Sequence, residues 1–462
     1  MDNKKICSNQ TCRAENPSNA QYCRSCGTPI QNHATDDFTL DIFKGIQFMP
    51  VSVVKVSFVN NFLIVLWVLF LTFAILASTT TGKYILHDIA DEMDIYWNSF
   101  PRFVRLISIL LTAVLSVSLL KSTYRKLMYK YAAEYIEQQA RKEGRKFIAY
   151  EPGFYSQDTI HVPSNTTVYL AGGSYFTGTF AIEDAENVSI LGRGVARPPR
   201  GYEGCHVHRS RNVLIDGLIL NTCPVGESNG VTLHDVRSIS HPSWGDGLNV
   251  FASSNVLYDR VFCRTSDDCT TAYATRKGFN GSVHNVRMTN STLWADVAHP
   301  IFIGIHGNSE VQDSIVGLVY ENIDILCQSE PQVDYQGCMA INCGDNNYVK
   351  DVLFDNIRIE QIHQGCLFHV KVGYNQKYCT APGRGVENVT FRNIRYYGAQ
   401  PYMSVINGYN EERQVKNVTF EGLKINGRAI YDEMPDKPRW YSTADFVPAF
   451  VGNHVDGVVF KK

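Results

Sequence analysis

The chain has 462 residues, more than one ordinary domain holds, so two or three structural units are expected. A formal net charge of −2 at pH 7 gives no reason to expect a nucleic acid partner. The 34 glycines and 25 tyrosines suit a β-rich chain with many turns, whereas the long apolar runs are confined to residues 51 to 120.

Residues 1 to 35 are predicted to form a small zinc ribbon. Four cysteines with the spacing C-x4-C-x10-C-x2-C occur there, and four thiolates satisfy the tetrahedral preference of zinc. The segment resembles the short zinc ribbons of many bacterial membrane proteins, with x4 in place of the usual x2 in the first knuckle. Such a ribbon is structural, or docks a protein partner; the alternative is a polar tail with unrelated cysteines. The expected ligands are Cys7, Cys12, Cys23 and Cys26.

The other nine of the 13 cysteines are scattered singly between Cys205 and Cys379. An odd, dispersed set is a poor disulfide framework. Free thiols that behave as small buried hydrophobes indicate a reducing compartment.

Residues 51 to 120 contain two apolar stretches, which predict a pair of transmembrane helices. The first, "FLIVLWVLFLTFAILAS" with its approach from Val51, is long enough to span a bilayer, which takes about 20 residues. The second extends from Phe103 to Leu120 and requires the charge of Arg105 to reach an interface. A buried helical hairpin is the alternative.

The charges beside these stretches predict the orientation in a cell membrane. Basic residues precede the first stretch and follow the second, whereas the loop between them carries "HDIADEMD" and few basic residues. By the positive-inside rule both termini are cytoplasmic. If the second stretch does not span, the C-terminal domain is extracellular. Residues 121 to 146 are predicted to form a charged linker helix.

Residues 147 to 462 repeat one short unit. The pieces "NVSILGRG", "NVLIDGLIL", "NVLYDRVF", "DVLFDNIRI" and "NVTFEGLKI" begin with Asn or Asp and Val and then alternate apolar with polar residues. Repeats of this length indicate a solenoid, and the β-branched alternation excludes helical repeats. The prediction is a right-handed parallel β-helix, an all-β fold, in which the asparagines of sequons such as "NVT" occupy turns.

Three carboxylates are spaced by about one coil of such a solenoid. Asp267 and Asp268 follow Asp246 by 21 and 22 residues, so the three are expected on one lateral face, with strands about 4.8 Å apart. Like charges that close raise at least one pKa, so one carboxyl holds a proton while another is ionised. Hydrolysis of a glycosidic bond needs such an acid and base. Solvated turn aspartates are the alternative.

"GDG", then "DDC" 21 residues later, then "AHPIFIGIHG", resembles the polygalacturonase family of glycoside hydrolases, family 28, and more loosely the dextranase family. The resemblance covers roughly residues 147 to 462. It implies an inverting mechanism with Asp267 as general acid and Asp246 with Asp268 activating water. It also implies that His299 adjusts the protonation of the acid, and it requires no catalytic cofactor.

One departure from the family leaves the sugar open. The family's Arg-x-Lys, which clamps a substrate carboxylate, should fall near "QGCMAINCGDNN", which offers no cation. An Arg fork is the natural partner of a uronate. Arg276 and Lys277, which follow the Asp pair, can replace the missing clamp or belong to a solvated turn. The nearby aromatic residues can stack on sugar rings or pack in the core. The candidate substrate-binding residues are Trp244, Tyr273, Arg276, Lys277, Asn342 and Tyr374.

Two functions compete. The first is a membrane-anchored glycoside hydrolase acting on a poly- or oligosaccharide; the second is a catalytically inactive carbohydrate-binding or scaffold β-helix. The presence of all three aspartates together with His299 favours the hydrolase.

Overall fold

The computed structural model describes residues 100 to 198, 203 to 240, 244 to 399 and 401 to 462, with a few positions before them. The chain forms two compact units, Met1–Met49 and Pro50–Lys462. In the first, β1 (Lys5–Ile6) and β2 (Glu15–Asn16) pair in antiparallel fashion. The four cysteines predicted to bind zinc lie outside the described residues, as does nearly all of the first predicted membrane span.

Helix α4 (Phe100–Lys142) contains the second predicted membrane span and most of the predicted linker helix. It ends with two basic residues, Arg141 and Lys142, which suit the negative end of the helix dipole. Gly144 follows with a φ of 69°, a conformation in which glycine commonly ends helices. Within the described part of the chain, no helix is long and apolar enough to cross a membrane. Membrane insertion of residues 103 to 120 stays a prediction.

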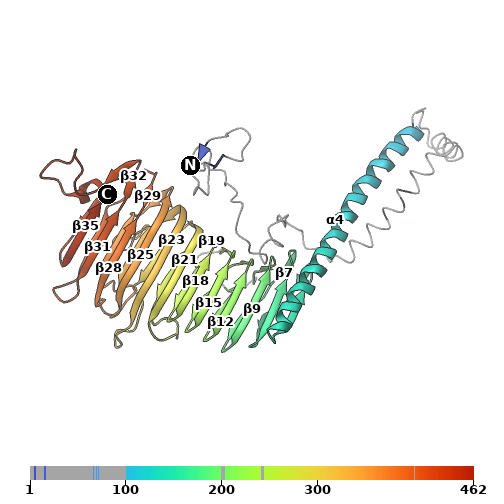
Figure 1. The fold of residues 1–462 in the computed structure, drawn as a ribbon, viewed down its shortest axis with the longest axis horizontal. Coiled ribbons are helices and arrows are strands. Elements are labelled where there is room, and N and C mark those ends of the chain that lie inside the picture. The colour runs from blue at the N-terminus through green and yellow to red at the C-terminus, as the bar shows by residue number, and fades with distance from the viewer. Residues whose placement is uncertain are drawn as a thin grey trace. The chain divides into compact units, whose positions relative to one another are not determined.

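The last turns of α4 pack against the first coils of the following domain. Ala132, Ile136 and Ala140 are buried, and the ring of Tyr129 stacks on that of Tyr169 at 6.0 Å between centroids. The end of the helix thus lies against the first strands of the domain, Lys146–Tyr150 and Thr166–Leu170 (Figure 1).

From Lys146 onward the chain is a parallel β-helix, as predicted from the repeats (Figure 1). Its strands form one 22-stranded and one 11-stranded sheet. The 22-stranded sheet holds two ladders of stacked parallel strands. The first ladder consists of β3 (Lys146–Tyr150), β6 (Thr166–Leu170), β9 (Glu186–Gly192), β12 (Arg211–Asp216), β15 (Asn229–His234), β18 (Ser254–Asp259), β21 (Val283–Ala295), β23 (Ser314–Ser329), β25 (Tyr348–Ile359), β28 (Gly385–Arg392), β31 (Val415–Glu421) and β35 (Val455–Lys461).

The second ladder bends away from the first within each coil. Three strands of the first ladder, β21, β23 and β25, are long enough to continue into it. Its separate strands are β4 (Gly153–Tyr155), β7 (Ser174–Phe176), β10 (Val195–Ala196), β13 (Ile219–Leu220), β16 (Arg237–Ile239), β19 (Phe262–Thr265), β26 (Ile362–Gln364), β29 (Arg395–Tyr396) and β32 (Leu423–Ile425), with β33 (Arg428–Ile430) antiparallel to β32.

The 11-stranded sheet is the third ladder, and it carries the candidate site. A short 3-10 helix, η1 (Thr443–Phe446), precedes its last strand. The strands are β5 (Thr159–His161), β8 (Thr179–Glu183), β11 (Cys205–His208), β14 (Val225–Gly226), β17 (Leu248–Phe251), β20 (Thr270–Tyr273), β22 (Ile301–Gly304), β24 (Met339–Cys343), β27 (Phe368–Val372), β30 (Ser404–Asn407) and β34 (Ala449–Val451).

The recurring Asn-Val pair explains the first ladder. The asparagine adopts a positive φ, 51° at Asn212 and 54° at Asn285, which Asn tolerates better than most residues. Its Nδ2 donates to the Oδ1 of the asparagine one coil earlier, as from Asn417 to Asn388 at 3.1 Å. Both of these asparagines begin "NVT" sequons, and both lie within strands β28 and β31 at a positive φ, so the prediction that they occupy turns between strands is wrong.

The inward side chains form one continuous core. The valine after each asparagine pairs in register with its counterpart on the next coil, and aromatic rings stack at a second inward position. The rings of Phe354 and Phe391 lie 4.9 Å apart, and those of Phe420 and Phe460 lie 4.6 Å apart. All nine cysteines of this domain are free and buried, as predicted.

Candidate active site

Three successive coils present a polar residue at the same register position, just before a strand of the third ladder. Leu248 of β17 pairs with Thr270 of β20, which pairs with Ile301 of β22. Two residues before each of these lie Asp246, Asp268 and His299, respectively. Backbone hydrogen bonds continue this register, because Gly247 N donates to Asp268 O at 2.8 Å and Cys269 N donates to His299 O at 2.8 Å.

Asp267 and Asp268 lie in the bend between β19 and β20, outside regular strand. Successive residues of a strand point to opposite faces, so a bend is what allows two adjacent carboxylates to serve one site. The Oδ1 atom of Asp267 accepts a hydrogen bond from the backbone N–H of Asp268 at 3.0 Å. The structure therefore brings together all four residues that the sequence nominated for catalysis.

Asp268 is the most tightly held of the three aspartates. Its Oδ1 lies 2.7 Å from Nδ1 of His299 and accepts the backbone N–H of His299 at 3.1 Å. Its Oδ2 accepts the hydroxyl of Tyr273 at 3.2 Å. These three contacts fix the orientation of its carboxyl group.

His299 is fully buried, between the ring of Phe302 at 4.3 Å and the edge of Tyr335 at 4.9 Å. Its Nε2 lies 2.8 Å from the carbonyl oxygen of Tyr335. A carbonyl only accepts, so Nε2 carries a hydrogen, and the short contact from Nδ1 to Asp268 holds a second proton. Burial lowers the pKa of His299, but the charge and hydrogen bond of Asp268 outweigh burial and raise it.

The charge on Asp268 perturbs both other aspartates. Burial and then the charge of Asp268 raise the pKa of Asp246 to about 6, although Asn249 Nδ2 donates to its Oδ2 at 2.7 Å. Burial, Asp268 and Asp246 together raise the pKa of Asp267 to about 7. Between these values Asp267 keeps its proton while Asp246 is ionised, which supplies one acid and one base.

The predicted substrate-binding residues differ in their positions. Trp244 is 77% exposed, two residues before Asp246, so its ring is open to a ligand. Arg276 and Lys277 are exposed in the turn after β20, and their charges lower the pKa of Asp246, which places them within electrostatic reach of the site.

Tyr273 corrects a prediction, because it is not a platform for sugars. Its ring is 6% exposed and packs against Phe251 at 6.0 Å and the edge of Phe302 at 5.9 Å. The loop after β20 folds back and contributes Phe279, which covers this outward face of the third ladder. Tyr273 instead serves the site through its hydroxyl, which holds Asp268.

Asn342 and Tyr374 line one pocket, together with Lys371, which the sequence did not single out. Lys371 of β27 pairs in register with Asn342, so the pocket has, one coil further on, the cation that is missing at Asn342 itself. Its Nζ forms an ion pair with Asp334. Asn342 Nδ2 donates to the same Tyr335 carbonyl that accepts from His299, at 3.3 Å, so the pocket adjoins the catalytic residues.

A comparison with family models finds no match, and neither does one with the curated proteins. Solved structures similar to this chain include a family 28 exopolygalacturonase from Yersinia enterocolitica, with 12% identity, a TM-score of 0.48 and coverage of 68% of this chain and 72% of that one. An endo-xylogalacturonan hydrolase from Aspergillus tubingensis has 11% identity, a TM-score of 0.43 and coverage of 68% and 87%. An alginate lyase from Paenibacillus sp. has 16% identity, a TM-score of 0.40 and coverage of 66% and 99%. Identities and TM-scores this low carry no argument about function.

Proposed function

We propose that the β-helix is an inverting glycoside hydrolase that acts on a poly- or oligosaccharide. The observation that carries the proposal is the convergence of Asp246, Asp267 and Asp268 with two carboxyl pKa values raised to about 6 and about 7. A solvated turn aspartate has no reason for such a shift, whereas an acid–base pair requires it.

In this mechanism Asp267 donates its proton to the leaving glycosidic oxygen. Asp246, with Asp268 beside it, accepts a proton from the water that attacks the opposite face of the sugar ring. His299 Nδ1 holds the carboxyl of Asp268 in place at 2.7 Å, and the charge of Asp268 raises the pKa of Asp267. His299 is thus a positioning residue, since it is fully buried behind Asp268 and cannot meet the substrate.

The surface beside Asp246 and the pocket at Asn342 offer aromatic and cationic contacts for a sugar. Trp244 is exposed beside Asp246, and Tyr374 is 41% exposed beside Lys371. A Lys is a point charge without the fork of an Arg, so it suits a carboxylate or a hydroxyl-rich neutral ring. Substrate tests therefore include neutral glucans as well as galacturonans.

The experiment is a hydrolysis screen with the full chain and a matched variant. Asp267→Asn keeps the side-chain oxygen that accepts from Asp268 N–H but cannot donate the proton. We expect it to lower sugar release by about 10² to 10⁴-fold, the usual contribution of a general acid. The exposed Asp158→Asn is the control and should match the wild type. If the wild type and both variants bind a sugar but none of them hydrolyses it, the inactive carbohydrate-binding alternative is favoured.

The proposal includes two N-terminal features that stay predictions from the sequence. One is a structural zinc held by Cys7, Cys12, Cys23 and Cys26. The other is a membrane anchor within residues 51 to 120, with both termini in the cytoplasm.

A further inference from the structure

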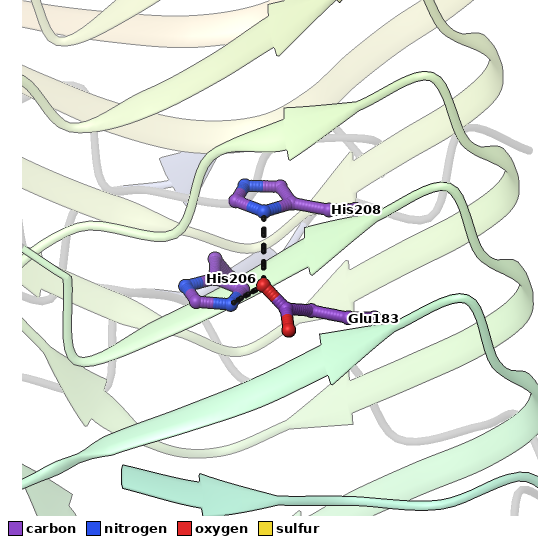
Figure 2. Close-up of side chains that lie close together, drawn as sticks. All are labelled: Glu183, His206 and His208. Carbon is purple, nitrogen blue, oxygen red and sulfur yellow. Dashed lines mark hydrogen bonds and ion pairs between the residues drawn. The ribbon is translucent and has the colours of Figure 1, made fainter. Parts of the chain in front are cut away.

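A second cluster of polar side chains lies on the outward face of the third ladder, two coils before the strand that follows Asp246. Figure 2 shows Glu183, His206 and His208 pointing toward one another. His206 and His208 are two apart on β11, so both rings project from the same face. Glu183, the last residue of β8, is the register partner of His208 on the adjacent coil.

The three side chains converge on one carboxylate oxygen. Glu183 Oε1 lies 3.1 Å from Nε2 of His206 and 3.8 Å from Nδ1 of His208. The three potential ligand atoms all lie within 4.8 Å of one another. Ligand atoms bound to one zinc at 2.0–2.2 Å and tetrahedral angles are roughly 3.3 to 3.5 Å apart, so the three atoms lie near the spacing that an ion requires.

We propose that Glu183, His206 and His208 bind a divalent first-row transition metal ion, with zinc as the ion that best fits two imidazoles and a carboxylate. Imidazole nitrogens favour such ions, whereas calcium and magnesium take oxygen ligands. This site is distinct from the four-cysteine site predicted at the N-terminus, and it does not depend on the proposed hydrolase activity.

A fourth residue, Glu203, supports the assignment. Its Oε2 lies 2.7 Å from Nδ1 of His206, and since a carboxylate only accepts, Nδ1 carries the hydrogen. Metal-binding histidines commonly donate their second N–H to a carboxylate in this way, which fixes the ring and directs the other nitrogen at the ion. Glu203 is then a positioning residue and His206 binds through Nε2.

His208 has a nitrogen available for an ion. Its Nε2 is buried and has no hydrogen-bond partner among the described residues. Because no hydrogen bond holds Nε2 there, the ring of His208 can turn. Its other nitrogen, Nδ1, faces Glu183 and is the one placed to bind the ion.

Binding requires one ring to turn. The rings of His206 and His208 are parallel within 1° and 4.1 Å apart, and the lone pair of a ring nitrogen lies in the ring plane. Two parallel stacked rings cannot both direct a lone pair at one ion. We therefore expect the ring of His208 to tilt out of the stack when the ion binds.

The site connects to the active site through a row of aromatic rings. His208 lies 4.8 Å from Phe279, which stacks on Phe251 at 5.9 Å. Phe251 in turn stacks on Tyr273, whose hydroxyl holds Asp268. A bound ion would therefore fix one end of the wall that supports the carboxylates.

The competing explanation is a metal-free charge network, in which a protonated His206 bridges Glu183 and Glu203. The two explanations predict different responses to zinc. A metal site gains stability from the ion because only the folded chain assembles its ligands. A charge network gains none.

The test measures the difference in bound zinc between full-length proteins, so that zinc at the N-terminal cysteines cancels. We expect His206→Ala/His208→Ala to hold about one zinc per chain less than the wild type. His284→Ala, an exposed histidine on β21, is the control and should hold the wild-type amount. Glu203→Gln should weaken zinc binding at this site by about 10 to 100-fold.

Two further measurements keep the result interpretable if the double variant folds poorly. Glu183→Gln is nearly isosteric and should also lose about one zinc per chain. Added zinc should raise the melting temperature of metal-stripped wild type more than that of Glu183→Gln. Equal zinc content and equal stabilisation by zinc in the wild type, Glu183→Gln and the double variant would overturn the proposal in favour of the charge network.

Discussion

Replacing Asp267 by Asn should stabilise the folded protein at high pH and not at low pH. Burial and the charges of Asp268 and Asp246 raise the pKa of this carboxyl from 3.8 to about 7. At a pH between these two pKa values, the folded protein keeps the proton on Asp267, whereas the unfolded chain has lost it. Stability is therefore lost as the pH rises from about 4 to about 7.

The size of the effect follows from that shift. A rise of about three pKa units corresponds to a ceiling of about 4 kcal/mol, at 1.36 kcal/mol per unit. Asp267 is only partly buried, so water screens some of the repulsion and we expect about 2 to 4 kcal/mol at pH 8. The Asn side chain keeps the hydrogen bond from Asp268 N–H, so no compensating loss is expected.

Urea unfolding of the wild type and Asp267→Asn at pH 4.5 and pH 8 measures this difference. The variant should exceed the wild type by much less at pH 4.5 than at pH 8, while Asp158→Asn changes neither value. Equal effects at the two pH values, or a less stable variant at pH 8, would show that Asp267 is an ordinary solvated carboxylate. A carboxylate that costs stability in this way is typical of an active site.

Three other predictions use the same site and the N-terminus. The pH profile of hydrolysis should be bell-shaped and narrow. Activity should fall below about pH 6 because Asp246 takes up a proton, and above about pH 7 because Asp267 loses its proton. A flat profile from pH 4 to 9 would contradict the assignment. His299→Gln, which cannot carry a charge, should move the alkaline limb to higher pH, since the charge of His299 lowers the pKa of Asp267; an unchanged limb would exclude that role. Cys23→Ser should remove about one zinc per chain; unchanged zinc content would argue against the N-terminal site.

The fold was predictable because the sequence pattern that specifies each coil is short and local. Most coils of the first ladder repeat an asparagine, aspartate or glycine with a positive φ, followed by an aliphatic residue that faces inward, so the pattern is visible without knowledge of neighbouring coils. The carboxylates were predictable for the same reason, because the offset of 22 between register partners such as Leu248 and Thr270 matches the 22 residues from Asp246 to Asp268.

Residues that depend on longer and unequal coils were not predictable. From Gly304 to Asn342 the offset is 38, and from Asn342 to Lys371 it is 29, so counting along the sequence does not find Lys371 as a neighbour of Asn342. The alternation places Tyr273 on the outward face, but the loop that buries it under Phe279 has no repeat. The same outward positions hold Glu183, His206 and His208, whose only local signal is the His-x-His spacing.

The configuration of the first-formed sugar tests the central claim most directly. NMR of the product, recorded before mutarotation with the best substrate of the hydrolysis screen, reads the anomer that the enzyme releases. An acid and a base acting through water predict the inverted anomer, and Asp267→Asn should release almost none. A retained anomer, or a fully active Asp267→Asn protein, would contradict the proposed roles of these aspartates.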